Sequence, residues 1–204
     1  MPVAVELYAD VVCPFAWVLL GQLLLERAAA GAVDVPILVR AWPLERVDGA
    51  LPSAERLVGD VAALRATVAP ERFQGFDASR LPESTIPAMA LTSACYGKAN
   101  EVGEAVAVRL RELVFEEGSD VGDPVVLGAL EAATGFHVTA DPGLVDAEYE
   151  LAVHRGVTGS PFLVAGDIHE FCPTFSVARD PAGRAVVTPT PWAADVLRSC
   201  FVDP

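Results

Sequence analysis

A junction between an expected strand and an expected helix, at residues 10–17 (Asp-Val-Val-Cys-Pro-Phe-Ala-Trp), constrains the fold of this chain more than any other feature. Residues 2–9 alternate in hydrophobicity as a half-buried strand does, and residues 15–20 form the apolar run of a helix. Pro14 suits the first helical position, where a missing N–H loses no partner. Cys13 is therefore expected at the amino-terminal end of a helix.

This position makes Cys13 a candidate nucleophile. Unpaired N–H groups and the positive end of a helix dipole stabilise a thiolate, so the pKa of Cys13 is expected below the ordinary value of about 8.5. Asp10 ends the strand and shapes the turn, and its negative charge would oppose thiolate formation. The alternative interpretation is that Cys13 is a small buried apolar side chain.

The order of expected elements predicts an α/β, thioredoxin-like fold. The first helix ends near Gly31, and an apolar strand over residues 33–42 completes a parallel βαβ unit. Residues 49–150 read as successive helices, residues 161–172 as a hairpin turning at Gly166-Asp167, and residues 190–202 as a last helix. We expect residues 1–48 and 151–204 to form the thioredoxin-like domain, and residues 49–150 an inserted all-helical domain.

Charge and hydropathy exclude several classes of partner. The 204 residues carry 28 acidic and 14 basic side chains, and a net charge of −14 repels nucleic acid and anionic membranes. The longest uncharged apolar stretch, residues 11–25, is shorter than the ~20 residues of a membrane span. The first residues lack a basic segment typical of a signal peptide. A cytoplasmic location is expected, where disulfides are transient and catalytic.

Four stretches of the sequence carry a family resemblance: residues 8–14, 86–91, 113–127 and 152–161. They resemble the DsbA-like family of thioredoxin-fold proteins, in particular its FrnE-type branch, and the related kappa-class glutathione transferases and 2-hydroxychromene-2-carboxylate isomerases. The resemblance implies that Pro161, after Ser160, is a cis-proline facing the catalytic sulfur. It is also compatible with a homodimer.

The chain departs from the family pattern where thiol oxidoreductases carry Cys-x-x-Cys. Ala16 stands at the fourth position, so a neighbouring thiol cannot resolve a mixed disulfide at Cys13. We therefore predict a monothiol thiol-disulfide oxidoreductase with Cys13 as nucleophile and Pro161 shaping the groove. No tightly bound cofactor is expected; glutathione, mycothiol or another small thiol completes the cycle. The substrate is a small-molecule or protein thiol or disulfide, and the expected substrate-binding residues are Pro14, Phe15, Ala16, Trp17, Ser160 and Asp10.

Two other functions stay open. Residues 14–17 also resemble the Ser-Pro-Tyr-Ser/Ala-Trp of the transferases and isomerases, with Cys13 in place of serine. In that case Cys13 activates a bound thiol cofactor, and Cys13→Ser keeps much of the activity. A binding protein that kept the fold and lost the chemistry is the third interpretation.

A second thiol, Cys172, is a candidate resolving residue. If Gly166-Asp167 is a two-residue turn, Pro161 lies opposite Cys172, and the two side chains share a face. Cys95 and Cys200 are expected to be structural. No metal site is predicted, because neither the cysteines nor the three histidines, His137, His154 and His169, have the spacing of zinc ligands.

Overall fold

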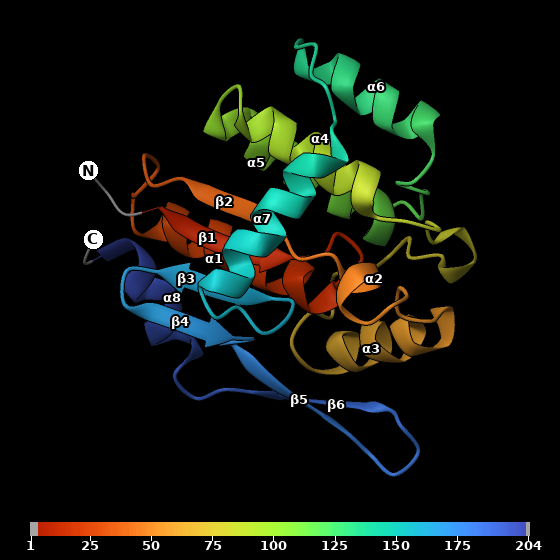
Figure 1. The fold of residues 1–204 in the computed structure, drawn as a ribbon. Coiled ribbons are helices and arrows are strands. Elements are labelled where there is room, and N and C mark those ends of the chain that lie inside the picture. The colour runs from red at the N-terminus through yellow and green to blue at the C-terminus, as the bar shows by residue number, and fades with distance from the viewer. Residues whose placement is uncertain (1–3, 203–204) are drawn as a thin grey trace.

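The computed structural model describes residues 4–202, and a four-stranded mixed sheet lies at its centre (Figure 1). The strands are β1 (Val5–Ala9), β2 (Ile37–Ala41), β3 (Phe162–Ala165) and β4 (Ile168–Phe171), in the order β2-β1-β3-β4. The pair β1–β2 is parallel, and the other two pairs are antiparallel. The predicted α/β class and the βαβ unit are confirmed. Residues 2 and 3 of the expected first strand lie outside the described residues.

Helix α1 (Pro14–Ala29) connects β1 to β2 and lies behind the sheet in Figure 1. The alternation along β1 explains this packing, since Val5, Leu7 and Ala9 join the apolar side chains of α1 in the main core. Gly31 follows the helix with a φ of 65°, a left-handed conformation that glycine adopts without steric cost. The predicted end of this helix is confirmed.

Helix α7 (Pro142–His154) crosses the opposite face of the sheet (Figure 1). Tyr8, which alternates with Leu7, joins a second apolar cluster on this face. The other buried members of that cluster come from β3, α7 and the segments beside them: Trp42, Ala152, Val157, Phe162 and Val164. The sheet is therefore covered on both sides.

The segment between β2 and α7 is helical, as predicted. It contains α2 (Leu44–Val47), α3 (Ala54–Thr67), the 3₁₀ turn η1 (Ala78–Arg80), α4 (Ile86–Tyr96), α5 (Asn100–Phe115) and α6 (Pro124–Thr134). Buried side chains of α3, α4 and α5 belong to the same apolar core as β1 and α1. The division into domains at residues 49 and 151 stays a prediction.

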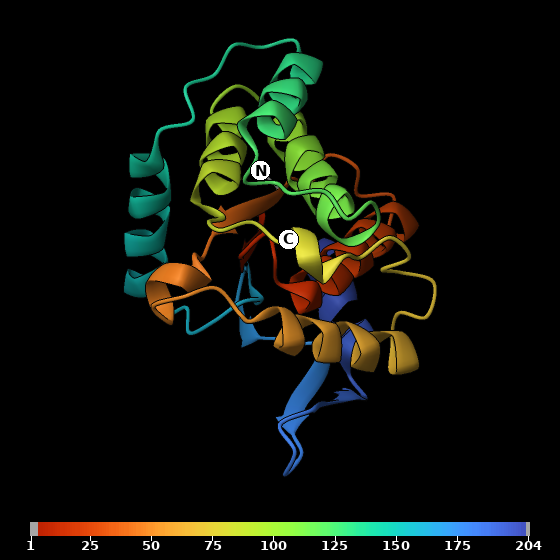
Figure 2. The ribbon, with the colours of Figure 1, turned by 90° about the vertical axis from the view of Figure 1, so that its right-hand side faces the viewer.

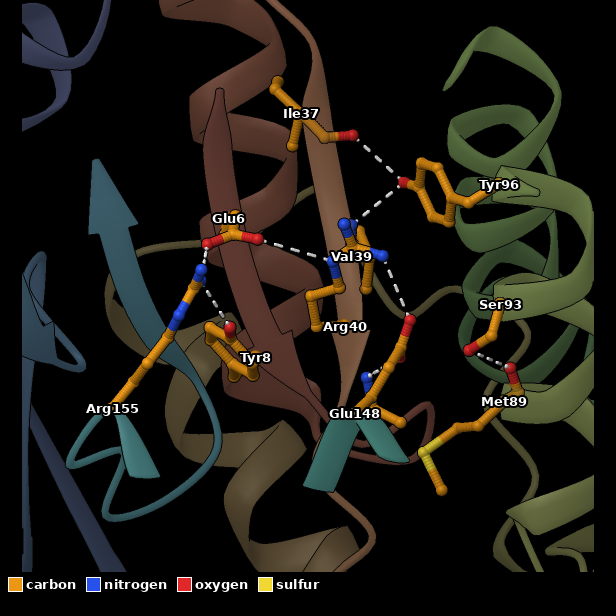
Figure 3. Close-up of polar contacts among 11 residues, drawn as sticks. Glu6, Tyr8, Ile37, Val39, Arg40, Met89, Ser93, Tyr96, Glu148 and Arg155 are labelled. Carbon is orange, nitrogen blue, oxygen red and sulfur yellow. Dashed lines mark hydrogen bonds and ion pairs between the residues drawn. The ribbon is translucent and has the colours of Figure 1, made fainter. Parts of the chain in front are cut away.

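Side chains from α4 and α7 cover the backbone of the edge strand β2 (Figure 3). The hydroxyl of Tyr96 accepts a hydrogen bond from the Val39 N–H at 2.9 Å and donates to the Ile37 carbonyl at 3.0 Å. The Glu148 carboxylate accepts from the Ala41 N–H at 2.7 Å. These contacts satisfy backbone groups that an edge strand otherwise presents to other chains.

A second hairpin, β5 (Phe175–Arg179) with β6 (Ala185–Pro189), follows β4 and extends away from the sheet beside α3 (Figure 2). No strand was expected here from the sequence, although the turn-forming Asp180-Pro181-Ala182-Gly183 stands between the two strands. Helix α8 (Ala193–Val202) closes the fold near its predicted place and packs against α1. Within residues 4–202, no helix combines the length and apolar character needed to cross a bilayer.

Candidate active site

Cys13 occupies the position just before the first turn of α1, as the sequence predicts. Its backbone is extended, with φ −80° and ψ 109°, and its carbonyl accepts the first helical hydrogen bond from the Trp17 N–H at 3.2 Å. Pro14 follows at the first helical position. The thiol thus stands at the amino-terminal end of a 16-residue helix, next to N–H groups that have no partner within the helix.

The loop that precedes β3 meets this turn directly. The Cys13 thiol donates a hydrogen bond to the Ser160 carbonyl oxygen at 3.4 Å, and the Asp10 N–H donates to the Ser160 hydroxyl at 3.1 Å. The peptide bond between Ser160 and Pro161 is cis. The strand-to-helix turn and the Ser160-Pro161 loop therefore form one local structure around the sulfur of Cys13.

Asp10 is fully buried and holds three segments together. Its carboxylate accepts hydrogen bonds from the N–H groups of Val12 at 3.0 Å and Leu44 at 2.8 Å, and from the Thr85 hydroxyl at 3.1 Å. The buried guanidinium of Arg111 donates to the Asp10 carbonyl at 3.2 Å. Burial raises the pKa of the Asp10 carboxyl, although these hydrogen bonds oppose the shift.

The expectation that Cys13 has a lowered pKa is not met. Burial raises the pKa of its thiol to about 11, and the charge of Asp10 adds to this effect. A side-chain hydrogen bond with Ser160 and the backbone N–H groups of Ala16 and Phe15 oppose it without overcoming it. Cys13 is only 4% exposed, so loss of hydration outweighs the helix terminus. A pKa of about 11 favours the protonated thiol at neutral pH.

A cavity of about 220 Å³ opens beside this sulfur. Its lining includes Cys13 and five further residues that the sequence analysis nominated: Pro14, Phe15, Ser160, Pro161 and Cys172. The ring of Phe15 is supported by Phe175 at the start of β5, with 5.9 Å between ring centroids. The volume lies below the ~300–1,000 Å³ of ordinary ligand pockets, which suits a small thiol or a single side chain.

Three other nominated residues do not line this cavity. Asp10 and Ala16 are completely buried beneath it. The side chain of Trp17 points elsewhere. Its ring centroid lies 4.4 Å from the Arg72 guanidinium carbon, and its indole N–H donates to the Glu116 carboxylate at 2.8 Å. Packing places these three side chains away from the cavity, and the expectation that they bind substrate stays a prediction.

One wall of the cavity was missed by sequence reasoning. Asp60 on α3 is almost fully buried and forms two hydrogen bonds with the guanidinium of Arg179 on β5, while Arg56 lies 3.9 Å away. All three residues line the cavity. Arg56 and Asp60 have the helical i, i+4 spacing, but their pairing with Arg179 joins segments about 120 residues apart, which no local pattern reveals.

Cys172 lies where the hairpin count predicts. Ala165 pairs with Ile168 and Phe162 with Phe171, so the next residues outward are Pro161 and Cys172, and the Cys172 N–H donates to the Pro161 carbonyl at 2.9 Å. Cys172 lines the cavity with Cys13, whereas Cys95 and Cys200 do not. Across residues 4–202 no cluster of histidine, cysteine and carboxylate side chains could hold a metal ion.

The sequence matches the family model of the DSBA-like thioredoxin domain over residues 4–179, which is most of the chain. The chain belongs to this family. The match includes Cys13, the Ser160–Pro161 bond and Cys172, and every residue that lines the cavity lies within it. No curated protein matches the chain.

Solved structures share the DSBA-like fold at low identity. A probable DsbA oxidoreductase from Streptomyces coelicolor is 18% identical, with a TM-score of 0.62, and the match covers 98% of this chain and 88% of that one. The cytosolic disulfide reductase DsbM from Pseudomonas aeruginosa, solved with GSH, is 14% identical, with a TM-score of 0.57 and coverages of 82% and 88%. A 2-hydroxychromene-2-carboxylate isomerase is 18% identical, with a TM-score of 0.57 and the same coverages.

Proposed function

We propose that this protein catalyses thiol-disulfide exchange at Cys13. The observation that carries the proposal is the position of the Cys13 sulfur, at the amino-terminal end of α1, against the Ser160–Pro161 bond and on the wall of a cavity. Membership of the DSBA-like family and the likeness to disulfide reductases and oxidoreductases support it. Pro161, Pro14, Phe15 and Ser160 form the wall against which the substrate lies.

The reaction needs one proton transfer and two exchange steps. Cys13 gives up its proton, and its thiolate attacks one sulfur of a bound disulfide, so that a Cys13 mixed disulfide forms and the other sulfur leaves as a thiol. The N–H groups of Phe15 and Ala16 stabilise the thiolate when it forms. A small thiol such as glutathione or mycothiol then attacks the substrate sulfur of the mixed disulfide, so that Cys13 leaves as a thiol and the small thiol departs bound to the substrate half as a disulfide. The substrate is a small-molecule or protein disulfide.

The raised pKa of Cys13 indicates the direction of exchange. Strongly oxidising members of such families owe this property to a stabilised thiolate, which favours the reduced form. At Cys13 burial removes that stabilisation. We therefore propose that the protein reduces disulfides at the expense of a small thiol, which suits a cytoplasmic protein. The homodimer with which the resemblance is compatible is tested by sedimentation of the purified chain.

One observation favours a second function, that of a kappa-like transferase or isomerase. A neutral Cys13 thiol that donates to an oxygen, as it does to Ser160, could equally donate to the sulfur of a bound thiol cofactor. In this case the hydroxyl of a serine replaces the Cys13 thiol with little loss.

The decisive experiment compares Cys13→Ser with wild type in the reduction of glutathione-type mixed disulfides by glutathione. We expect the rate above background to fall by about a thousandfold or more, because the nucleophile is gone. Cys95→Ser is the matched control, since Cys95 is buried in α4 and does not line the cavity. If Cys13→Ser keeps more than about half the activity, Cys13 is not the nucleophile, because removing the nucleophile would abolish the exchange step. That result contradicts thiol-disulfide exchange at Cys13 and favours the transferase or isomerase.

A further inference from the structure

We propose that Cys172 is the resolving thiol of this site and that it forms a reversible disulfide with Cys13. The inference rests on the proposed exchange at Cys13 and changes its second step: Cys172, in place of the small thiol, attacks the mixed disulfide at Cys13, and the small thiol acts afterwards. It replaces the missing second cysteine of the helix turn, where Ala16 stands, by a cysteine from the hairpin β3–β4.

The two cysteines lie on either side of one short stretch of backbone. The Cys13 thiol is hydrogen bonded to the carbonyl of Ser160, and the Cys172 N–H to the carbonyl of Pro161, the next residue. Both side chains line the same cavity. The charge of a Cys13 thiolate contributes to the raised pKa of Cys172, after burial, so the two sulfurs influence each other.

The backbone at Cys172 is unusual for its residue type. Its φ is 48°, in the left-handed region that costs a residue with a side chain about 1 kcal/mol or more and that asparagine and glycine adopt more readily. Cys172 is nevertheless buried, although Glu170 and Phe171 just before it are exposed. The conformation ends β4 and leaves the thiol in the cavity instead of in solvent.

The Cys13–Cys172 bond requires the end of the hairpin to bring Cys172 to Cys13. A disulfide needs Cα atoms about 4.4–6.8 Å apart. Strand β4 is the edge of the sheet and pairs only with β3, so its end can shift without breaking pairs to a second strand. Cys95 and Cys200 have no comparable access to Cys13: Cys95 is buried in α4, and Cys200 on α8 donates to the carbonyl of Val196 in its own helix.

Formation of the Cys13–Cys172 disulfide balances with the bound disulfide as the only oxidant. After Cys13 has attacked a disulfide, it carries one half of the substrate as a mixed disulfide, and the other half has left as a thiol. Cys172 loses its proton and attacks the Cys13 sulfur; the Cys13–Cys172 bond forms, and the second half leaves as a thiol that takes the proton. The two protein thiols are thereby oxidised and one disulfide is reduced to two thiols. Two molecules of an external small thiol then reduce the Cys13–Cys172 bond in two exchange steps and leave as their own disulfide.

The test is intact mass and peptide mapping after reduced protein is mixed with glutathione disulfide. For wild type we expect the loss of two hydrogens and a Cys13–Cys172 cross-linked peptide, and for Cys172→Ser a lasting glutathione adduct on Cys13. Cys95→Ser and Cys200→Ser should behave as wild type. The wild-type cross-link is read without any variant, so a folding defect in Cys172→Ser does not obscure it.

Two results separate this inference from the proposed function. The same lasting adduct on Cys13 in wild type and in Cys172→Ser overturns the role of Cys172 and leaves exchange at Cys13 intact. Failure of both proteins to form either an adduct or a cross-link, while exchange between small thiols proceeds in the same buffer, overturns exchange at Cys13 itself.

Discussion

The thiol of Cys13 donates its hydrogen bond to the carbonyl oxygen of Ser160, 147 positions later in the chain. The hydroxyl of the same serine accepts from the Asp10 N–H. Two bonds between the same two loops fix the sulfur against the Ser160–Pro161 bond, so the site depends on a long-range contact as much as on the helix that carries Cys13.

Ser160→Ala should weaken both the fold and the thiolate. It leaves the Asp10 N–H without its acceptor, at a cost of about 1–3 kcal/mol, and removes the side-chain hydrogen bond that lowers the pKa of Cys13. We expect a lower urea midpoint and slower alkylation of Cys13 at a given pH. Ser160→Thr, which keeps the hydroxyl, is the control. An unchanged alkylation rate in the alanine variant contradicts the claim that the Ser160 side chain lowers the pKa of Cys13.

Alkylation of Cys13 should accelerate steadily with pH. With a pKa of about 11, only about one Cys13 in ten thousand is a thiolate at pH 7, so the rate rises about tenfold per pH unit across the alkaline range. The measurement uses a variant with Cys95, Cys172 and Cys200 replaced by serine. An alkylation rate that reaches a plateau below pH 8 means that the pKa of Cys13 is low, and it contradicts the proposal that the protein works as a disulfide reductant.

Asp10→Asn should change how stability depends on pH. The pKa of Asp10 is raised in the folded protein, so folding favours the protonated carboxyl, and this contribution is lost as pH rises through the folded-state pKa. The unfolding free energy of wild type, relative to Asp10→Asn, is therefore expected to fall from acidic to neutral pH. Denaturant titrations at several pH values check this. Asp167→Asn, which removes one exposed turn carboxylate, controls for the change in net charge.

Arg179→Ala should loosen the cavity wall formed by α3 and β5. It leaves the Asp60 carboxylate buried, with only Arg56 nearby at 3.9 Å. We expect a loss of about 1–3 kcal/mol, below the ~3–5 of a fully buried pair because the Arg179 side chain is 32% exposed. Adding Asp60→Asn should recover part of the loss in urea unfolding. Arg184→Ala, which breaks an exposed pair with Asp180, is the control.

Tyr96→Phe should destabilise the β2 edge. The variant removes the hydroxyl that accepts from Val39 and donates to Ile37, and leaves a buried N–H unpaired, at a cost of about 1–3 kcal/mol. Thermal unfolding and hydrogen exchange at Val39 report the change. Glu148→Gln keeps an acceptor for the Ala41 N–H and should cost less. If the Val39 N–H is equally protected from hydrogen exchange in Tyr96→Phe and wild type, the hydrogen bond from Val39 to the Tyr96 hydroxyl does not contribute to that protection.

Local pattern was sufficient for the parts of the site that lie within one or two elements. Pro14 after Cys13 predicts the helix start, and the turn at Gly166-Asp167 places Cys172 opposite Pro161. The protonation state of Cys13 could not be predicted this way, because it depends on how completely distant segments exclude water from the sulfur. The same holds for Asp60 and Arg179, which meet only in the folded chain.

The covering of β2 has a consequence for shortened forms of this protein. Tyr96 of α4 and Glu148 of α7 supply the partners for three backbone groups of that strand. A minimal protein made by deleting the helices between β2 and β3 would present β2 as an open, mostly apolar edge. Such an edge pairs readily with other chains, so the trimmed protein is expected to aggregate, however well its remaining elements fold.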